Sequence, residues 1–158
     1  MHVKELMTET PSACNVADSA NEAARIMWEH DCGAVPVVDP AGHVVGIVTD
    51  RDLCMAAYFR GVALPAIPVA DVMAREVCTC QAEDDLGAAE RLMQQHQIRR
   101  LPVLANGETL VGMLSLSDVA LGVRRSGGPR QKSQDGDELL QTVTAVSEPR
   151  SERRATGR

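Results

Sequence analysis

The chain has 158 residues, of which 44% are hydrophobic and only three are aromatic: one Phe, one Tyr and one Trp. This composition predicts a small folded protein whose core is built from aliphatic residues, methionine and alanine. No apolar run approaches the roughly 18–20 residues that span a bilayer, and the N-terminal sequence lacks the features of a signal peptide. Residues 1–123 carry 17 acidic and 8 basic side chains, which argues against nucleic acid as a partner. The five cysteines are an odd number, so we expect free thiols and a cytoplasmic location.

The strongest pattern in the sequence is an internal repeat. Residues 3–58 align with residues 69–124 without a gap, at a constant shift of 66 positions, and 13 positions are identical. About three or four identities would be expected by chance. Two copies, each too small to bury its own apolar face, predict two halves packed on each other around a pseudo-two-fold axis. We therefore expect these divisions: repeat 1 at 1–60, a linker at 61–68, repeat 2 at 69–124, a flexible linker at 125–137, and a short helix with a tail at 138–158.

Each copy predicts the same order of elements: strand, helix, strand, strand, helix. The first copy predicts a helical turn at 4–8, an extended stretch at 11–15, a helix beginning near Ser19, strands at 34–38 and 43–48, and a helix at 51–59. In that copy, Ser19 and Glu22 have the spacing of a capping box.

The second copy predicts the equivalent elements 66 positions later. These are a turn at 70–75, an extended stretch at 77–81, a helix beginning near Asp84 and Asp85, strands at 101–104 and 109–114, and a helix at 117–123. Asn106-Gly107 between the two strands is a strong hairpin signal.

A short polar motif closes the second hairpin strand of each copy. Thr49 and Ser115 end the strand, and Asp52 and Asp118 follow three residues later on the first turn of a helix. Such a carboxylate can accept both hydrogens of a ribose 2′,3′-diol, while the hydroxyl and the helix amides suit a phosphate. The competing interpretation is that each aspartate only stabilises the N-terminus of its own helix. Two copies in register favour the ligand-binding interpretation.

Each repeat has PVV or PVL in one strand and the pattern G-h-h-T/S-x-x-D after the next, where h is apolar. This paired pattern resembles the CBS-domain family, named for cystathionine β-synthase. The resemblance covers residues 3–124 and is closest to stand-alone bacterial proteins with two repeats. It implies an α/β (α+β) fold of two β-α-β-β-α repeats packed sheet to sheet, with two symmetry-related clefts. It also implies a regulatory module that binds AMP, ADP, ATP, NAD or S-adenosylmethionine.

The resemblance assigns residues to each cleft. One cleft would contain Thr49, Arg51 and Asp52 together with Cys78, Thr79, Arg99 and Arg100. The other would contain Ser115, Ser117 and Asp118 together with Ser12, Ala13, Gly33 and Ala34. Because two arginines stand where the first copy has Gly33 and Ala34, we expect only the first cleft to clamp phosphates through guanidinium groups. An ordinary exposed arginine pair is the alternative.

Other candidate sites are weaker. Cys78 and Cys80 would face one side of an extended stretch, but two thiols do not make a metal site, so we expect buried thiols and no metal. His30 and His96 occupy matched positions near helix ends, where packing or contact with the helix dipole explains them better than catalysis. No nucleotide-loop, nucleophile-elbow or metalloprotease motif is present, so we expect neither catalytic residues nor enzymatic activity.

Two kinds of function are consistent with these patterns. In the first, an adenosine nucleotide changes the geometry of a homodimer and thereby signals to an effector protein. In the second, the repeats form a ligand-independent dimeric interaction module. The resemblance implies that the homodimer packs helix against helix through residues Leu53, Met55, Ala56, Tyr58, Leu121 and Val123.

Overall fold

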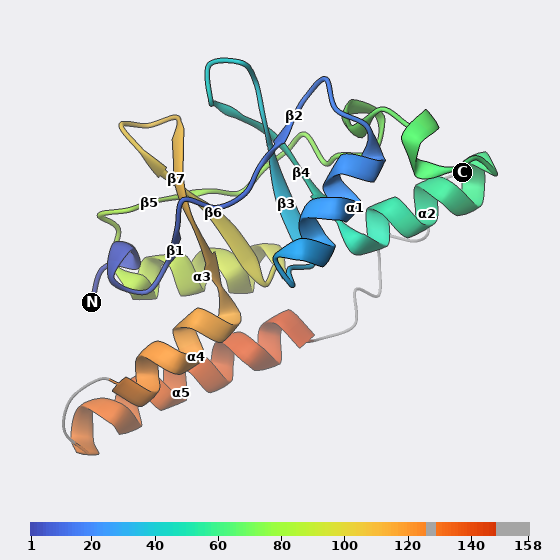
Figure 1. Ribbon diagram of the computed structural model, residues 1–158. Helices are drawn as coiled ribbons and strands as arrows, with labels where there is room; N and C mark the ends of the chain where they lie inside the picture. Colours follow the sequence, from blue (N-terminus) through green and yellow to red (C-terminus); the bar gives the residue numbers. More distant parts are fainter. Residues whose placement is uncertain (126–128, 148–158) are drawn as a thin grey trace.

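The computed structural model describes residues 1–125 and 129–147, which form two similar halves, each with a small sheet and flanking helices (Figure 1). The first repeat contains a 3-10 helix (Val3–Glu5), β1 (Thr8–Glu9), β2 (Cys14–Asn15), α1 (Ala20–Glu29), β3 (Ala34–Val38), β4 (Val44–Thr49) and α2 (Asp50–Arg60). The second contains 3-10 helices at Leu64–Ala66 and Val69–Asp71, then β5 (Cys80–Gln81), α3 (Leu86–His96), β6 (Arg100–Ala105), β7 (Thr109–Ser115) and α4 (Leu116–Arg125). The final element is α5 (Pro129–Ser147). The predicted α/β fold of two repeats is confirmed.

Each half has one sheet with the same internal connections. The order is β2-β3-β4 in one sheet and β1-β7-β6-β5 in the other. The short strands β2 and β5 pair in parallel with β3 and β6, which then form antiparallel hairpins with β4 and β7. The predicted turn at Asn106-Gly107 is present, with φ values of +52° and +91°. Ala105 pairs with Thr109, so the hairpin loop comprises residues 106–108, and glycine at position 107 adopts its positive φ without steric cost.

The leading segment of each repeat packs on the other half. Val3 lies in the core of the second half, and its amide donates to the carbonyl of Asp84. Val69 lies in the core of the first half, and its amide donates to the carbonyl of Asp18. The strand β1 pairs with β7, far from the rest of its own repeat. Each core is therefore completed by a segment from the other repeat.

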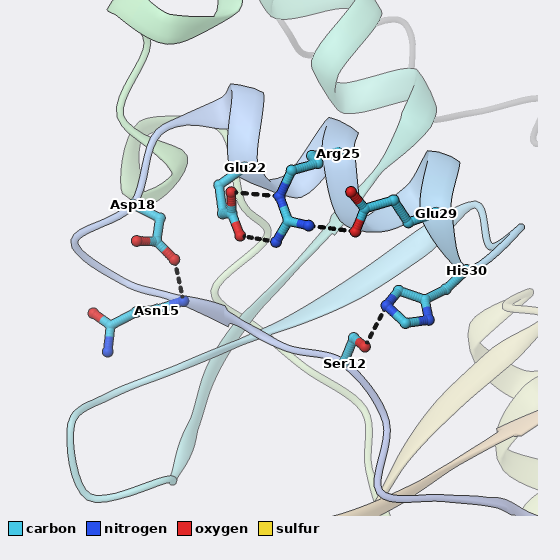
Figure 2. Close-up of polar contacts among 7 residues, drawn as sticks. All are labelled: Ser12, Asn15, Asp18, Glu22, Arg25, Glu29 and His30. Carbon is cyan, nitrogen blue, oxygen red and sulfur yellow. Dashed lines mark hydrogen bonds and ion pairs between the residues drawn. The ribbon is translucent and has the colours of Figure 1, made fainter.

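The helix caps differ in part from the sequence-based expectation. Asp85 caps α3 by accepting a hydrogen bond from the amide of Gly87 at 3.1 Å, as an acidic N-cap should. Ser19 is the N-cap of α1, but its side chain makes no capping bond, so the capping box predicted for Ser19 and Glu22 is not formed. The Glu22 carboxylate pairs instead with Arg25, which also pairs with Glu29 (Figure 2).

The C-terminal helix is longer than expected. α5 begins at Pro129, so residues 129–137, which the sequence predicts as part of a flexible linker, are helical. The helix packs against α3 and α4 (Figure 1), and Leu139, Thr142 and Val146 face them. Packing against the second half, which single-sequence composition does not reveal, stabilises this polar segment as a helix. Residues 126–128 of the predicted linker and 148–158 of the predicted tail lie outside the described residues.

None of the helices in the described part of the chain combines the length and the apolar character needed to cross a membrane.

Candidate functional site

The two polar motifs adopt the same geometry at the N-termini of α2 and α4. Thr49 is the N-cap of α2, and its hydroxyl donates to Oδ2 of Asp52 at 2.7 Å while accepting from the Asp52 amide at 3.3 Å. The Thr49 amide also donates to Oδ2 of Asp52, at 2.8 Å. Ser115 and Asp118 reproduce all three bonds, at 2.6, 3.2 and 2.8 Å. The motifs are therefore two equivalent capping boxes.

These hydrogen bonds bear on both interpretations of Asp52 and Asp118, as helix caps and as ligand-binding groups. Asp52 and Asp118 do stabilise helix N-termini, as the alternative interpretation holds. Among the described residues, however, the hydrogen bonds to each carboxylate all end on Oδ2. Asp52 and Asp118 are half-buried, and the bonds to Oδ2 fix the orientation of each carboxylate, including its second oxygen, Oδ1. A fixed carboxylate oxygen beside a hydroxyl and a helix N-terminus can accept hydrogen bonds from a diol.

The strand that starts each hairpin lies beside the motif of its own repeat. In the first half, Ala34 is opposite Thr49 in the β3–β4 register, and the carbonyl of Gly33 accepts from the amide of Asp50. In the second half, Arg100 is opposite Ser115, and the carbonyl of Arg99 accepts from the amide of Leu116. Backbone pairing thus places Arg99 and Arg100 next to Ser115, whereas the resemblance grouped them with Thr49.

The side chain of Arg100 reaches across to the other half. A side-chain carbon built on Gly33 would lie 3.7 Å from Nη1 of Arg100 and 3.1 Å from Oδ2 of Asp50. The half-buried guanidinium of Arg100 is therefore close to the start of α2, while its backbone lies beside Ser115. Arg99, by contrast, is exposed. Sequence reasoning did not include Asp50, although its place directly after the N-cap Thr49 could have indicated it.

The remaining predicted residues lie along the short leading strands. Ser12 and Ala13 directly precede β2, and Cys78 and Thr79 precede β5; all four are half-buried. Figure 2 shows that Ser12 points toward His30 at the end of α1, with Oγ and Nε2 3.0 Å apart. Arg51 and Ser117 lie in the first turns of α2 and α4 and are exposed.

The cysteines and the acidic residues provide no metal centre within the part of the chain that the structure describes. There, no three His, Cys, Asp or Glu residues cluster closely enough to hold an ion. All five cysteines are free. Burial raises the pKa of both Cys14 and Cys80 to about 12, with a further contribution from the neighbouring Asp18 and Asp84, so these thiols remain protonated.

The chain belongs to the CBS-domain family: the family model matches residues 3–58 and 69–124. Proteins built from such pairs are generally regulatory. The uncharacterized protein YlbB of Bacillus subtilis is 35% identical over 142 residues, covering 85% of this chain and 93% of its own length.

Solved structures of CBS-domain pairs have the same fold. Hypoxic Response Protein I, crystallised with two coordinated zinc ions, is 24% identical, with a TM-score of 0.70 over 77% of this chain and 98% of its own. The CBS-domain pair of MJ0100, in complex with 5′-methylthioadenosine and S-adenosyl-L-methionine, is 24% identical, with a TM-score of 0.70 over 80% of this chain and 98% of its own. CBSX2 in complex with AMP is 23% identical, with a TM-score of 0.68 over 78% of this chain and 96% of its own. At these identities the likeness concerns the fold.

Proposed function

We propose that this protein is a regulatory module that binds an adenosine-derived nucleotide between its two repeats. The observation that supports this most directly is the pair of identical capping boxes, in which Asp52 and Asp118 each keep Oδ1 outside the capping bonds. That oxygen accepts a hydrogen bond from the ribose, and the adjacent helix N-terminus favours the negative charge of a phosphate. The AMP and S-adenosyl-L-methionine complexes of proteins with this fold support the choice of ligand class.

The guanidinium of Arg100 lies between the two motifs and favours a phosphorylated ligand. It comes from the second half and ends beside Gly33 and Asp50 of the first. A cation between the two halves attracts a phosphate. A phosphate bound there couples ligand binding to the relative position of the halves. AMP, ADP, ATP and NAD all carry the required group, and the regulatory output passes through a homodimer to an effector protein. The free thiols support a location in the cytoplasm.

A ligand-independent interaction module is the second candidate, and one observation favours it. The capping bonds already satisfy one oxygen of each aspartate and both hydroxyls, so the motif has a structural role without any ligand. In that case no nucleotide would affect stability.

The decisive experiment is thermal unfolding with adenosine, AMP, ADP, ATP, NAD and S-adenosylmethionine, followed by calorimetry with the best ligand. A ligand at 100 times its Kd should stabilise the folded chain by about 2.7 kcal/mol. The 2′-deoxy form of the same ligand should bind roughly 10- to 100-fold more weakly, because one hydrogen bond to a charged group is lost. Equal affinity for the two forms would contradict the assignment of the aspartates, and no shift with any compound would favour the second candidate.

A further inference from the structure

The hairpins of the two repeats meet at their tips, residues 39–43 and 106–109. His43, just before β4, forms an isolated antiparallel bridge with Thr109, the first residue of β7. The shift of 66 residues that relates the repeats maps His43 onto Thr109 itself. A residue that contacts its own counterpart lies on the two-fold axis that relates the copies. The bridge therefore marks the pseudo-two-fold axis, and the two residues that meet there are different.

His43 lies between two carboxylates, one from each repeat. Its Nδ1 is 3.2 Å from Oδ2 of Asp39 in the same hairpin, and its Nε2 is 3.5 Å from Oε2 of Glu108 in the other hairpin. In the described part of the chain, no lysine or arginine forms an ion pair with either carboxylate. The cluster occurs only once, because the positions equivalent to Asp39 and Glu108 are Ala105 and Gly42.

The two carboxylates are held to different degrees. Asp39 is half-buried, and its Oδ1 accepts hydrogen bonds from the backbone amides of His43 and Ala41, both at 2.9 Å. The bond from the His43 amide is the main cause that holds the pKa of Asp39 below its ordinary value, so Asp39 remains charged. Glu108, by contrast, is 75% exposed and its one ion pair among the described residues is with His43. Asp39 is therefore a fixed partner of the imidazole, and Glu108 is a movable one.

The protonation state of His43 decides whether both contacts can exist. An imidazolium ring has an N–H group on each nitrogen and can donate toward both carboxylates, whereas a neutral ring has one N–H group and one lone pair. Asp39 is nearer and already fixed, so it retains the N–H group of the neutral ring. The lone pair then faces Glu108 and repels its carboxylate toward solvent. Imidazole is the side chain whose charge changes between pH 5 and 8, so this exchange occurs near neutral pH.

We propose that His43 is a pH-sensitive link between the repeats: protonation joins the two hairpin tips through Glu108, and deprotonation releases them. The exchanged segments around Val3 and Val69 hold the halves together in either state, since each is buried in the core of the other half. The change is therefore confined to the hairpin tips. The link adds pH to the conditions to which the protein responds, and it does not depend on the proposed nucleotide.

A double-mutant cycle tests the link. The parent chain, His43→Thr, Glu108→Gln and the double variant are unfolded in urea at about pH 5.5 and about pH 8. Threonine is the residue that the second repeat has at the equivalent position, and glutamine keeps the size of Glu108. At about pH 5.5 we expect a coupling of about 2- to 5-fold in the folding equilibrium constant, as for other exposed ion pairs, and at about pH 8 none. Equal coupling at both pH values, or no coupling at the lower one, would overturn the proposal.

The matched control replaces Glu108→Gln with Glu29→Gln. Glu29 is another exposed carboxylate, but it lies on α1, where it pairs with Arg25 (Figure 2). We expect no coupling between His43 and Glu29 at either pH. Coupling as large as that of Glu108 would overturn the proposal, because it would show a general attraction between the His43 charge and the acidic surface.

Nuclear magnetic resonance gives a second measurement, which needs no unfolding. The signal of the Glu108 side-chain carboxyl carbon should move as His43 titrates between about pH 6 and 8, and it should stay constant over this range in His43→Thr. A Glu108 signal that behaves in the same way in both chains would overturn the proposal. Both measurements are made without nucleotide. A missing thermal shift with AMP would therefore contradict the proposed nucleotide site and leave the link between the hairpin tips unaffected.

Discussion

Met73 packs against Gly46 so closely that no larger residue fits at position 46 without movement. A side-chain carbon added to Gly46 would lie 2.8 Å from Cγ of Met73 and 3.1 Å from the carbonyl oxygen of Ala74. The second half repeats the contact, with Met7 against Gly112 at 3.0 Å. In both cases the methionine comes from the leading segment of the other repeat. The glycine of each strand thus allows the exchanged segment to lie directly on the sheet.

The first prediction concerns this contact. Gly46→Ala should lower the free energy of unfolding by about 1–3 kcal/mol, because the added methyl group overpacks the contact with Met73 and the Ala74 carbonyl. Gly112→Ala is the matched variant and should cost less, since Met7 is only half-buried whereas Met73 is 7% exposed. Urea unfolding of both variants and the parent measures the difference. A larger loss in Gly112→Ala than in Gly46→Ala would contradict the argument.

The second prediction separates the two roles of the capping aspartates. Asp52→Asn with Asp118→Asn keeps an acceptor for the capping bonds but removes the charge that grips the ribose. We expect a loss of about 1 kcal/mol in stability at most and a roughly 10-fold or greater loss in affinity for every adenosine ligand.

The control for the second prediction is Asp18→Asn with Asp84→Asn. These carboxylates also accept a hydrogen bond from a backbone amide, Asp18 from Asn15 (Figure 2) and Asp84 from Gln81, but they lie outside the motif. Calorimetry should show ligand affinity unchanged in this pair. If both pairs of variants lose affinity equally, the effect comes from general destabilisation and not from the ribose contact.

Much of the fold could be predicted from the sequence because the two repeats align at a constant shift of 66 residues. This alignment placed both motifs, the Asn106-Gly107 turn, and the helices and hairpin strands correctly, because each depends on local residue patterns, but it missed the strand β1, where a helical turn was expected. It could not show that Val3 and Val69 exchange cores, since an alignment of repeats does not say which core a segment enters. The sequence predicted the C-terminal part of α5 as a short helix but missed residues 129–137, because they are polar and form a helix that depends on packing further along the chain.

In the candidate site, too, local contacts could be predicted from the sequence and long-range contacts could not. Local sequence predicts that Thr49 and Asp52 share a helix N-terminus, and the structure has them in hydrogen-bond contact. The neighbours of Arg100 depend on a long side chain crossing between the halves, and no local pattern fixes that direction.

The third prediction follows from the buried thiols. The pKa values of Cys14 and Cys80 are raised from 9.0 to about 12 in the folded chain, chiefly by burial. Between pH 9 and 12 the unfolded chain loses these protons while the folded chain keeps them, so stability falls as pH rises. The fall is at most roughly 1.4 kcal/mol per pH unit for each thiol. Urea unfolding of Cys14→Ala with Cys80→Ala should show a shallower decline above pH 9 than the parent, and parallel declines would contradict the assignment.

The last prediction concerns the phosphate. Arg99→Ala with Arg100→Ala removes the guanidinium groups at the start of β6 without changing Asp52, Asp118 or the caps. We expect calorimetry to show a roughly 10- to 100-fold loss of ADP affinity at one of two sites, because charge-assisted hydrogen bonds to phosphate are lost. Adenosine, which has no phosphate, should bind as it does to the parent. Of the two single variants, Arg100→Ala should cause most of the loss in ADP affinity, because Arg99 is exposed whereas the side chain of Arg100 lies beside Gly33 and Asp50.

The control for the last prediction is Lys4→Ala with Arg91→Ala, which gives the same change in net charge away from Arg99 and Arg100 and should leave ADP binding intact. If this control weakens ADP binding as much as the arginine variant does, the effect is general electrostatic attraction, and Arg99 and Arg100 are an ordinary surface pair.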